Sequence, residues 1–179
     1  MILYFVRHAS AGEHFSNAKK DEKRPLDADG IDQCGFVGRA LAAVNAQVDV
    51  IISSPLKRAT QTASLIGNEI GYEGKLQLEP ALRPEASFAD FRRMLEKYLR
   101  HEAVMVVGHN PSITDFLSRM IAKSGCEAII DFKKGAVARA ETVRHSATLN
   151  WFFTPRIARE IQAAATAAAE KSHPKTSRK

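Results

Sequence analysis

A chain of 179 residues is long enough for one domain with a substantial core. Apolar residues make up 45% and charged residues 26%, which is typical of a soluble globular protein, and no segment reaches the roughly 20 apolar residues that a membrane span needs. The net charge of +6 lies mostly at the C-terminal end, where six basic residues stand against two acidic ones from Arg156 onward, so a nucleic-acid-binding domain is not indicated.

The first predicted element is a strand over Ile2–Val6, an apolar run without alternation that suits a strand buried on both faces. It ends in Arg7 and His8, and the small residues of Ala9–Gly12 follow. Open α/β sheets bind ligands at the carboxyl ends of their strands. An isolated Arg-His pair could also mark the point where a strand simply reaches the surface. Whether Arg7 and His8 belong to a site therefore depends on the rest of the chain.

A polar stretch over Glu13–Arg24 has no periodicity and predicts a loop, which could be a lid, a basic entrance to a site, or a solvated surface loop. A helix is then expected from about Pro25 to Val44, with Asp27 or Asp29 as its N-cap.

The second predicted strand is Val48–Ile52, and Ser54 followed by Pro55 is typical of a helix start, with the Ser54 hydroxyl as the cap. Arg58 would lie about one turn into that helix. A helix N-terminus and a guanidinium together offer donors and positive charge to an anion.

Lys75–Leu78 is a short strand candidate, and the loop Glu79–Glu85 follows it. The next helix is expected over Phe88–Leu99, with an apolar stripe formed by Phe88, Phe91, Leu95 and Leu99. His101, at the end of this helix, is assigned a structural role because cations suit a helix C-terminus.

Ala103–Val107 is the third apolar run and leads into His109, after which a helix is predicted over Pro111–Ile121. Two further strands are expected over Ala136–Arg139 and Thr148–Phe153.

The C-terminal part divides into an Ala-rich helix over Arg156–Lys171 and a disordered tail over Ser172–Lys179. The folded domain is therefore expected to span residues 1–155. Two further histidines, His14 and His145, are interpreted as surface residues.

If the three strand ends converge, they bring together Arg7, His8, Arg58 and His109. Phosphate fits this set best, because two arginines suit a dianion and a metal site would need carboxylates or cysteines beside the histidines. One neutral imidazole could attack phosphorus while the other, if protonated, binds the equatorial oxygens.

Four stretches of the chain resemble, in order, the motifs of the histidine phosphatase superfamily, also called the phosphoglycerate mutase-like fold: VRHASAG, RPLDADG, SSPLKRATQTA and VVGHNPS. The resemblance extends from Met1 to about Phe153, and the RPL stretch is most similar to the SixA-type phosphohistidine phosphatase branch. It implies an α/β fold of three layers (α/β/α) with a mostly parallel sheet, and no metal or organic cofactor.

On this resemblance, His8 is the phosphorylated nucleophile, and Arg7, Arg58 and His109 form the phosphate pocket. Ser10 and Asn110 are expected to contact the substrate as well. Glu85 is the nearest candidate for a general acid, although the SixA-type branch typically lacks this acid. The family's usual Arg-His-Gly is here Arg-His-Ala, with Ala9 small enough to preserve activity.

We therefore expect a phosphatase that dephosphorylates phosphohistidine in a signalling protein, for example a phosphotransfer domain. The alternatives are a small-molecule phosphomonoesterase and a phosphate-binding regulatory module without turnover. Cys34 and Cys126 show no metal-ligand spacing and are expected to be ordinary buried thiols. The N-terminal run is too short for a signal peptide. These features lead us to expect a cytoplasmic monomer that binds neither a membrane nor nucleic acid.

Overall fold

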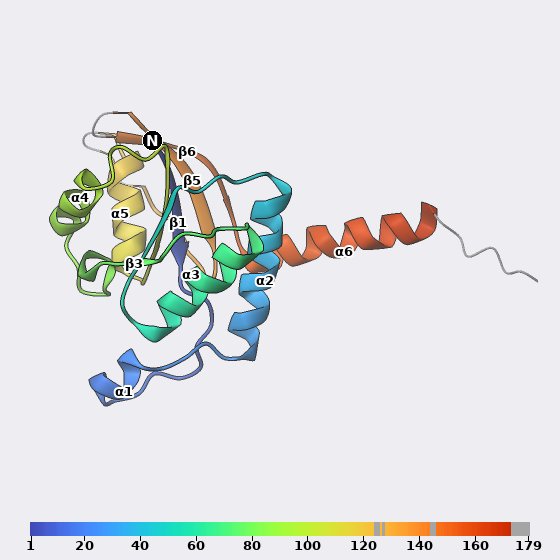
Figure 1. The fold of residues 1–179 in the computed structure, drawn as a ribbon, viewed down its shortest axis with the longest axis horizontal. Coiled ribbons are helices and arrows are strands. Elements are labelled where there is room, and N and C mark those ends of the chain that lie inside the picture. The colour runs from blue at the N-terminus through green and yellow to red at the C-terminus, as the bar shows by residue number, and fades with distance from the viewer. Residues whose placement is uncertain (124–125, 127, 144–145, 173–179) are drawn as a thin grey trace, which may run out of the picture.

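The computed structural model describes residues 1–123, 126, 128–143 and 146–172 (Figure 1). The described residues form six strands, six α-helices and one 3₁₀ turn, in the order β1 (Ile2–Arg7), α1 (Ala18–Glu22), α2 (Ala28–Ala43), β2 (Val50–Ser53), α3 (Lys57–Glu69), β3 (Gln77–Leu78), the 3₁₀ turn (Pro80–Leu82), α4 (Phe88–Glu96), β4 (Ala103–Gly108), α5 (Ser112–Ile121), β5 (Val137–Val143), β6 (Ser146–Phe153) and α6 (Pro155–Ser172). In this part of the chain, no helix is both long and apolar enough to cross a bilayer.

The strands form one sheet in the order β3-β2-β4-β1-β5-β6. Strands β3, β2, β4 and β1 are parallel to one another, and β5 runs antiparallel to both of its neighbours. Arg7 pairs with Gly108, and Ser53 pairs with Val107. The register therefore ends β1, β2 and β4 at the same edge of the sheet, and the predicted α/β class with a mostly parallel sheet is confirmed.

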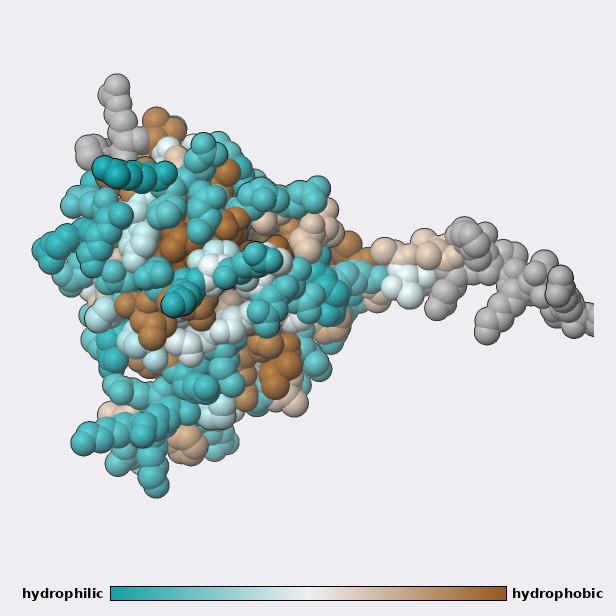
Figure 2. Space-filling view, in the orientation of Figure 1, coloured by the Kyte–Doolittle hydropathy of each residue, from teal (hydrophilic) through white to brown (hydrophobic). Residues whose placement is uncertain are grey.

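Helices cover both faces of the sheet, which gives three layers (Figure 1). Along β1, Leu3 and Phe5 pack into the core beneath α4 and α5, whereas Tyr4 and Val6 pack into the core beneath α2 and α3. This is why the N-terminal run is apolar without alternation: both of its faces are buried. The visible surface of the molecule is mostly hydrophilic, with smaller hydrophobic patches (Figure 2).

Asp27, one of the two predicted caps, begins α2 and also fixes the loop after β1. Its Oδ1 accepts from the Gly30 amide at 2.7 Å, and its Oδ2 accepts from the Ser10 hydroxyl at 2.8 Å and the Gly12 amide at 2.6 Å. One carboxylate therefore caps a helix and holds the segment that follows His8.

Gly30 is required by the close approach of α2 to the same loop. A Cβ at this position would lie 2.0 Å from the Ser10 carbonyl oxygen. We expect Gly30→Ala to lower the free energy of unfolding by about 1–3 kcal/mol because main chain must move. Gly35→Ala on the same helix is the matched control. Its Cβ would meet only the flexible Arg39 side chain, so it should be neutral or stabilising by up to about 1 kcal/mol. Urea unfolding of both variants measures the difference, and equal effects would contradict this explanation.

Several details of the sequence prediction are wrong. The stretch expected as a loop contains α1, which Asn17 caps by accepting from the Lys20 amide. Helix α4 ends at Glu96, and the following turns place Leu99 in solvent, 67% exposed, while Tyr98 packs against the core. Cys34 is buried as expected, but Cys126, beyond the end of α5, is exposed.

Helix α6 matches the predicted Ala-rich helix and points away from the rest of the molecule (Figure 1). Its base is anchored by the buried Ala158 and by Gln162, whose Nε2 donates to the Phe36 carbonyl at 2.7 Å. The sequence predicts a disordered tail from Ser172, but Ser172 is the last residue of α6. The rest of that tail, residues 173–179, lies outside the described residues, as does His145.

Candidate active site

A cavity of about 350 Å³ opens at the carboxyl ends of β1, β2 and β4. His8 directly follows β1, Arg58 is the second residue of α3, and His109 directly follows β4. The rings of His8 and His109 lie with their centroids 4.8 Å apart. The predicted residues that line this cavity are Arg7, His8, Arg58, Glu85, His109 and Asn110.

The main chain selects the tautomer of His8. Its Nδ1 lies 2.8 Å from the Ala9 carbonyl oxygen, which can only accept, so Nδ1 carries the hydrogen and Nε2 keeps the lone pair. Burial lowers the pKa of His8 to about 3. The hydrogen bond to Ala9 acts to raise this pKa, whereas the positive charges of Arg58 and Arg7 lower it further. At neutral pH the ring is thus an uncharged base with a free Nε2.

The two arginines line the cavity, and each keeps one buried donor without a partner among the described residues. Arg7 donates through Nη1 to the Phe132 carbonyl at 2.7 Å, and Arg58 donates through Nη1 to Asp21. The Nε atoms of both arginines are buried without a hydrogen-bond partner among the described residues. Burial lowers the pKa of each guanidinium, but arginine remains charged in proteins. Because unpaired buried donors are costly, these groups are suited to an anion.

His109 is held by Ser54, which the sequence predicts as the cap of α3. That prediction is wrong: α3 has Leu56 at its N-cap position without a side-chain cap, and the Ser54 hydroxyl lies 2.9 Å from His109 Nε2. The hydroxyl can donate to Nε2 or accept from it, and His109 Nδ1 is buried without a partner among the described residues. Burial and then the neighbouring His8 and Arg58 lower the pKa of His109 to about 2. The ring is therefore uncharged at neutral pH.

These two pKa values predict how stability depends on pH. An exposed histidine titrates near 6.5, so between that pH and about 3 the unfolded chain binds protons that folded His8 and His109 do not. The free energy of unfolding should therefore fall as the pH is lowered through this window. Urea unfolding between about pH 7.5 and 5 measures the slope. It should be shallower in His8→Ala, and an unchanged slope would contradict the assignment.

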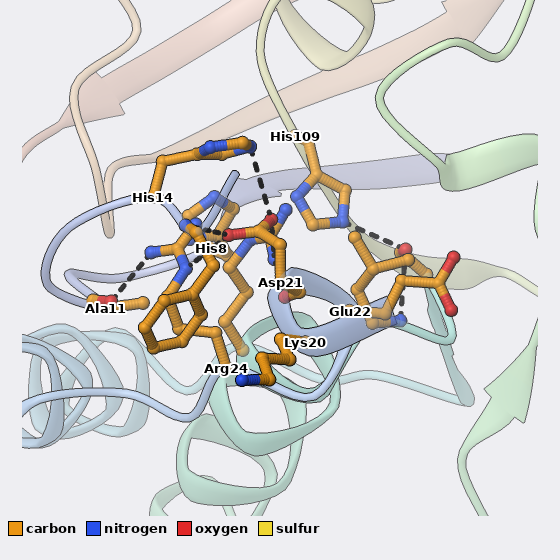
Figure 3. A network of polar contacts seen from close by, with 12 residues as sticks. His8, Ala11, His14, Lys20, Asp21, Glu22, Arg24 and His109 are labelled. Carbon is orange, nitrogen blue, oxygen red and sulfur yellow. Dashed lines mark hydrogen bonds and ion pairs between the residues drawn. The ribbon is translucent and has the colours of Figure 1, made fainter. Parts of the chain in front are cut away.

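Asp21 and Arg24 are functional-site residues that the sequence analysis missed. Asp21, on α1, is 6% exposed. Its Oδ1 accepts from Arg24 Nε at 2.7 Å, and its Oδ2 lies 3.2 Å from Arg58 Nη1 (Figure 3). Burial acts to raise the pKa of Asp21, but hydrogen bonds from Arg24 and Phe15 and the arginine charges outweigh it and hold the pKa at about 2. The spacing Asp-x-x-Arg was the only available signal.

His14 lies beside this network rather than on a remote surface. Its side chain is 74% exposed, as the surface interpretation requires, but it lines the cavity, with Nε2 3.6 Å from Asp21 Oδ2 (Figure 3).

The other three predicted site residues lie at different places relative to the cavity. Asn110 lines the cavity and donates through Nδ2 to the Phe132 carbonyl at 3.2 Å, the same acceptor that Arg7 uses. Ser10 is not among the residues that line the cavity, and its hydroxyl is bound to Asp27. Glu85 lines the rim, 68% exposed at its side chain, and accepts from Arg83 Nε at 2.8 Å, which lowers its pKa.

Among the described residues, no group of three or more His, Cys, Asp or Glu side chains is arranged to hold a metal ion. The functional groups on the cavity wall are instead three imidazoles (His8, His14 and His109) and three guanidinium groups (Arg7, Arg58 and Arg83), and the carboxylates beside them are paired with arginine.

Comparisons with known proteins agree with this arrangement. An uncharacterized protein of Picosynechococcus sp. is 31% identical over 119 residues, which are 65% of this chain and 70% of that protein. The phosphohistidine phosphatase SixA of Escherichia coli (strain K12) is 24% identical over 115 residues, which are 63% of this chain and 70% of that protein. A solved structure of the protein histidine phosphatase SixA complexed with tungstate has a similar fold, with a TM-score of 0.78 at 21% identity, covering 88% of this chain and 99% of that chain.

Residues 3–111 match the histidine phosphatase superfamily (branch 1), and this span contains Arg7, His8, Arg58 and His109. The resemblance seen in the four motifs is thereby confirmed over most of the folded chain. With its cationic cavity at the strand ends and its SixA-like fold, the chain belongs to branch 1 of the histidine phosphatase superfamily.

Proposed function

We propose that this phosphatase works through a phosphohistidine intermediate on His8 and that its substrate is phosphohistidine in a signalling protein, such as a phosphotransfer domain. The observation that carries the proposal is the state of His8. It is a buried, neutral ring whose Nδ1 is bound to Ala9, so that Nε2 is the available nucleophile in a cavity that Arg7 and Arg58 also line. A neutral imidazole with a lone pair is the form that can attack phosphorus.

The proposed reaction has two displacements. The guanidinium groups of Arg7 and Arg58 and the ring of His109 hold the phosphoryl oxygens, and positive charge there stabilises the transition state. A bond forms from His8 Nε2 to phosphorus as the substrate's P–N bond breaks, and the electron pair leaves with the substrate imidazole. Water then attacks the phosphorus, the bond to His8 breaks, and inorganic phosphate is released.

The carboxylates of the cavity favour phosphohistidine over an oxygen ester. All three that line it are paired with arginine: Asp21 with Arg24 and Arg58, and Glu22 and Glu85 with Arg83. An alkoxide leaving group needs a proton in the transition state. Hydrogen bonds from arginine hold the pKa of Asp21 and that of Glu85 below their usual values, so neither of these two carboxylates keeps a proton to supply at neutral pH. A phosphohistidine ring that is already protonated leaves as a neutral imidazole. This arrangement does not favour Glu85 as a general acid.

The test is phosphate release from a phosphohistidine-bearing phosphotransfer domain compared with a panel of small phosphoesters, with His8→Ala as the control. We expect the protein substrate to be preferred and its turnover to disappear in the variant. Faster His8-dependent turnover of one small ester would indicate a metabolic phosphatase. Absence of His8-dependent release from every substrate would leave only a phosphate-binding module.

A further inference from the structure

The carboxylate of Asp21 is an unexpected group at a cavity suited to anions. It repels a phosphoryl group, and its burial costs free energy unless it is fully bonded. Its neighbours on α1 are exposed, yet Asp21 turns inward and is buried. A short, polar helix gains little from burying a single charge, so the contacts of this side chain must account for its position.

Asp21 fixes the orientation of Arg58. Arg58 Nη1 donates both to the Asp21 main-chain oxygen at 2.9 Å and to its Oδ2 at 3.2 Å. With Nη1 held twice, the flexible side chain is fixed, and Arg58 lines the cavity, where a guanidinium can bind an anion.

The second oxygen of Asp21 ties this arginine to the loop that carries the nucleophile. Oδ1 accepts from Arg24 Nε at 2.7 Å, and Arg24 Nη1 donates to the Ala11 carbonyl at 2.6 Å and to the Gly12 carbonyl at 3.3 Å (Figure 3). Oδ1 also accepts from the Phe15 amide at 3.1 Å. A single carboxylate therefore links α1, the start of α3 and the segment after His8.

We propose that Asp21 is a positioning residue that orients the Arg58 guanidinium toward the phosphoryl group. Because Asp21 lies on α1, this orientation depends on α1 being packed in place. The proposal rests on the proposed function, in which Arg58 binds the phosphoryl oxygens. Asp21 itself does not contact the reacting atoms, and its effect on the reaction passes through Arg58.

A double-mutant cycle between Asp21 and Arg58 tests this role. The readouts are His8-dependent phosphate release and the binding of inorganic phosphate, measured by calorimetry. We expect Asp21→Ala to lower kcat/KM by about 10–100-fold, the scale of a misplaced catalytic group, and to weaken phosphate binding. In the Arg58→Ala background the same change should have little further effect, because the group that Asp21 positions is already absent.

Glu141→Ala is the matched control. Glu141 also accepts from an arginine, Arg139, at 2.7 Å, but it pairs with Ile2 at the opposite end of β1 from His8. Its removal should leave both readouts unchanged. Asp21→Asn, which keeps the size of the side chain, replaces Asp21→Ala if thermal unfolding shows that the alanine variant is not folded, and the same non-additivity is expected of it.

Two results would overturn the proposal: phosphate binding as tight as in the wild type after loss of Asp21, or an equal loss of activity with and without Arg58. The second would indicate a purely structural role. If the wild type binds phosphate but shows no His8-dependent release, the proposed function fails, and the binding arm of the cycle still tests Asp21.

Discussion

His8→Ala is expected to reduce phosphate release by at least about 10⁴-fold, because the variant has no nucleophile and the second displacement has no intermediate to act on. Binding of inorganic phosphate should persist in weakened form, since Arg7, Arg58 and His109 stay in place. Steady-state release of phosphate from the phosphotransfer domain measures the first effect, and calorimetry with inorganic phosphate measures the second.

His101→Ala is the control for this prediction. His101 lies beside Tyr98, with ring centroids 6.0 Å apart, and is not among the residues that line the cavity. Its activity should equal that of the wild type. If His8→Ala retains more than about one hundredth of the wild-type rate, water attacks the substrate directly and the covalent route is wrong.

Arg58→Ala is expected to have the second largest effect, a fall in kcat/KM of about 10²–10³-fold together with weaker binding of inorganic phosphate. The variant loses a positive charge and a planar set of hydrogen-bond donors. Both interact more strongly with a phosphoryl group in a buried cavity than in water. It also leaves Asp21 buried with one partner fewer. Arg58→Lys should recover only part of the activity, because an ammonium restores the charge but not the paired geometry.

Arg93→Ala serves as its control, since Arg93 is exposed on α4 and pairs with Asp90. Such surface pairs contribute little to stability, so activity and unfolding should both be close to wild type. Full activity in Arg58→Lys would show that charge alone suffices and that the orientation set by Asp21 is unimportant.

The core of the fold was predictable from sequence because burial leaves a direct pattern in it. The three apolar runs before Arg7, Ser53 and His109 are buried on both faces, and such strands must lie inside a sheet covered on both sides. Their carboxyl ends meet at one edge because the strands are parallel. The placement of Arg7, His8 and His109 at one cavity follows from these two facts.

The polar half of the site was not predictable in the same way. Helix α1 has no apolar face, and its one buried residue, Asp21, is held by hydrogen bonds from the nearby Phe15 and Arg24 and from Arg58, which is distant in sequence. A contact between residues distant in sequence also explains why the role predicted for Ser54 is wrong. A serine before a proline indicates a cap, but the tertiary structure places its hydroxyl against His109 instead. Ser10 likewise follows the nucleophile in sequence, yet its hydroxyl is taken by Asp27.

The most direct test of the account is to trap the phosphoenzyme. The protein is mixed with a phosphohistidine-bearing phosphotransfer domain, quenched in alkali within the first turnover and digested, and the modified residue is identified by mass spectrometry and its ring nitrogen by NMR. The account predicts a phosphoryl group on His8, at Nε2, since Nδ1 is engaged by the Ala9 carbonyl. A phosphoryl group on another residue, or turnover with no phosphorylated His8 at any time point, would contradict it.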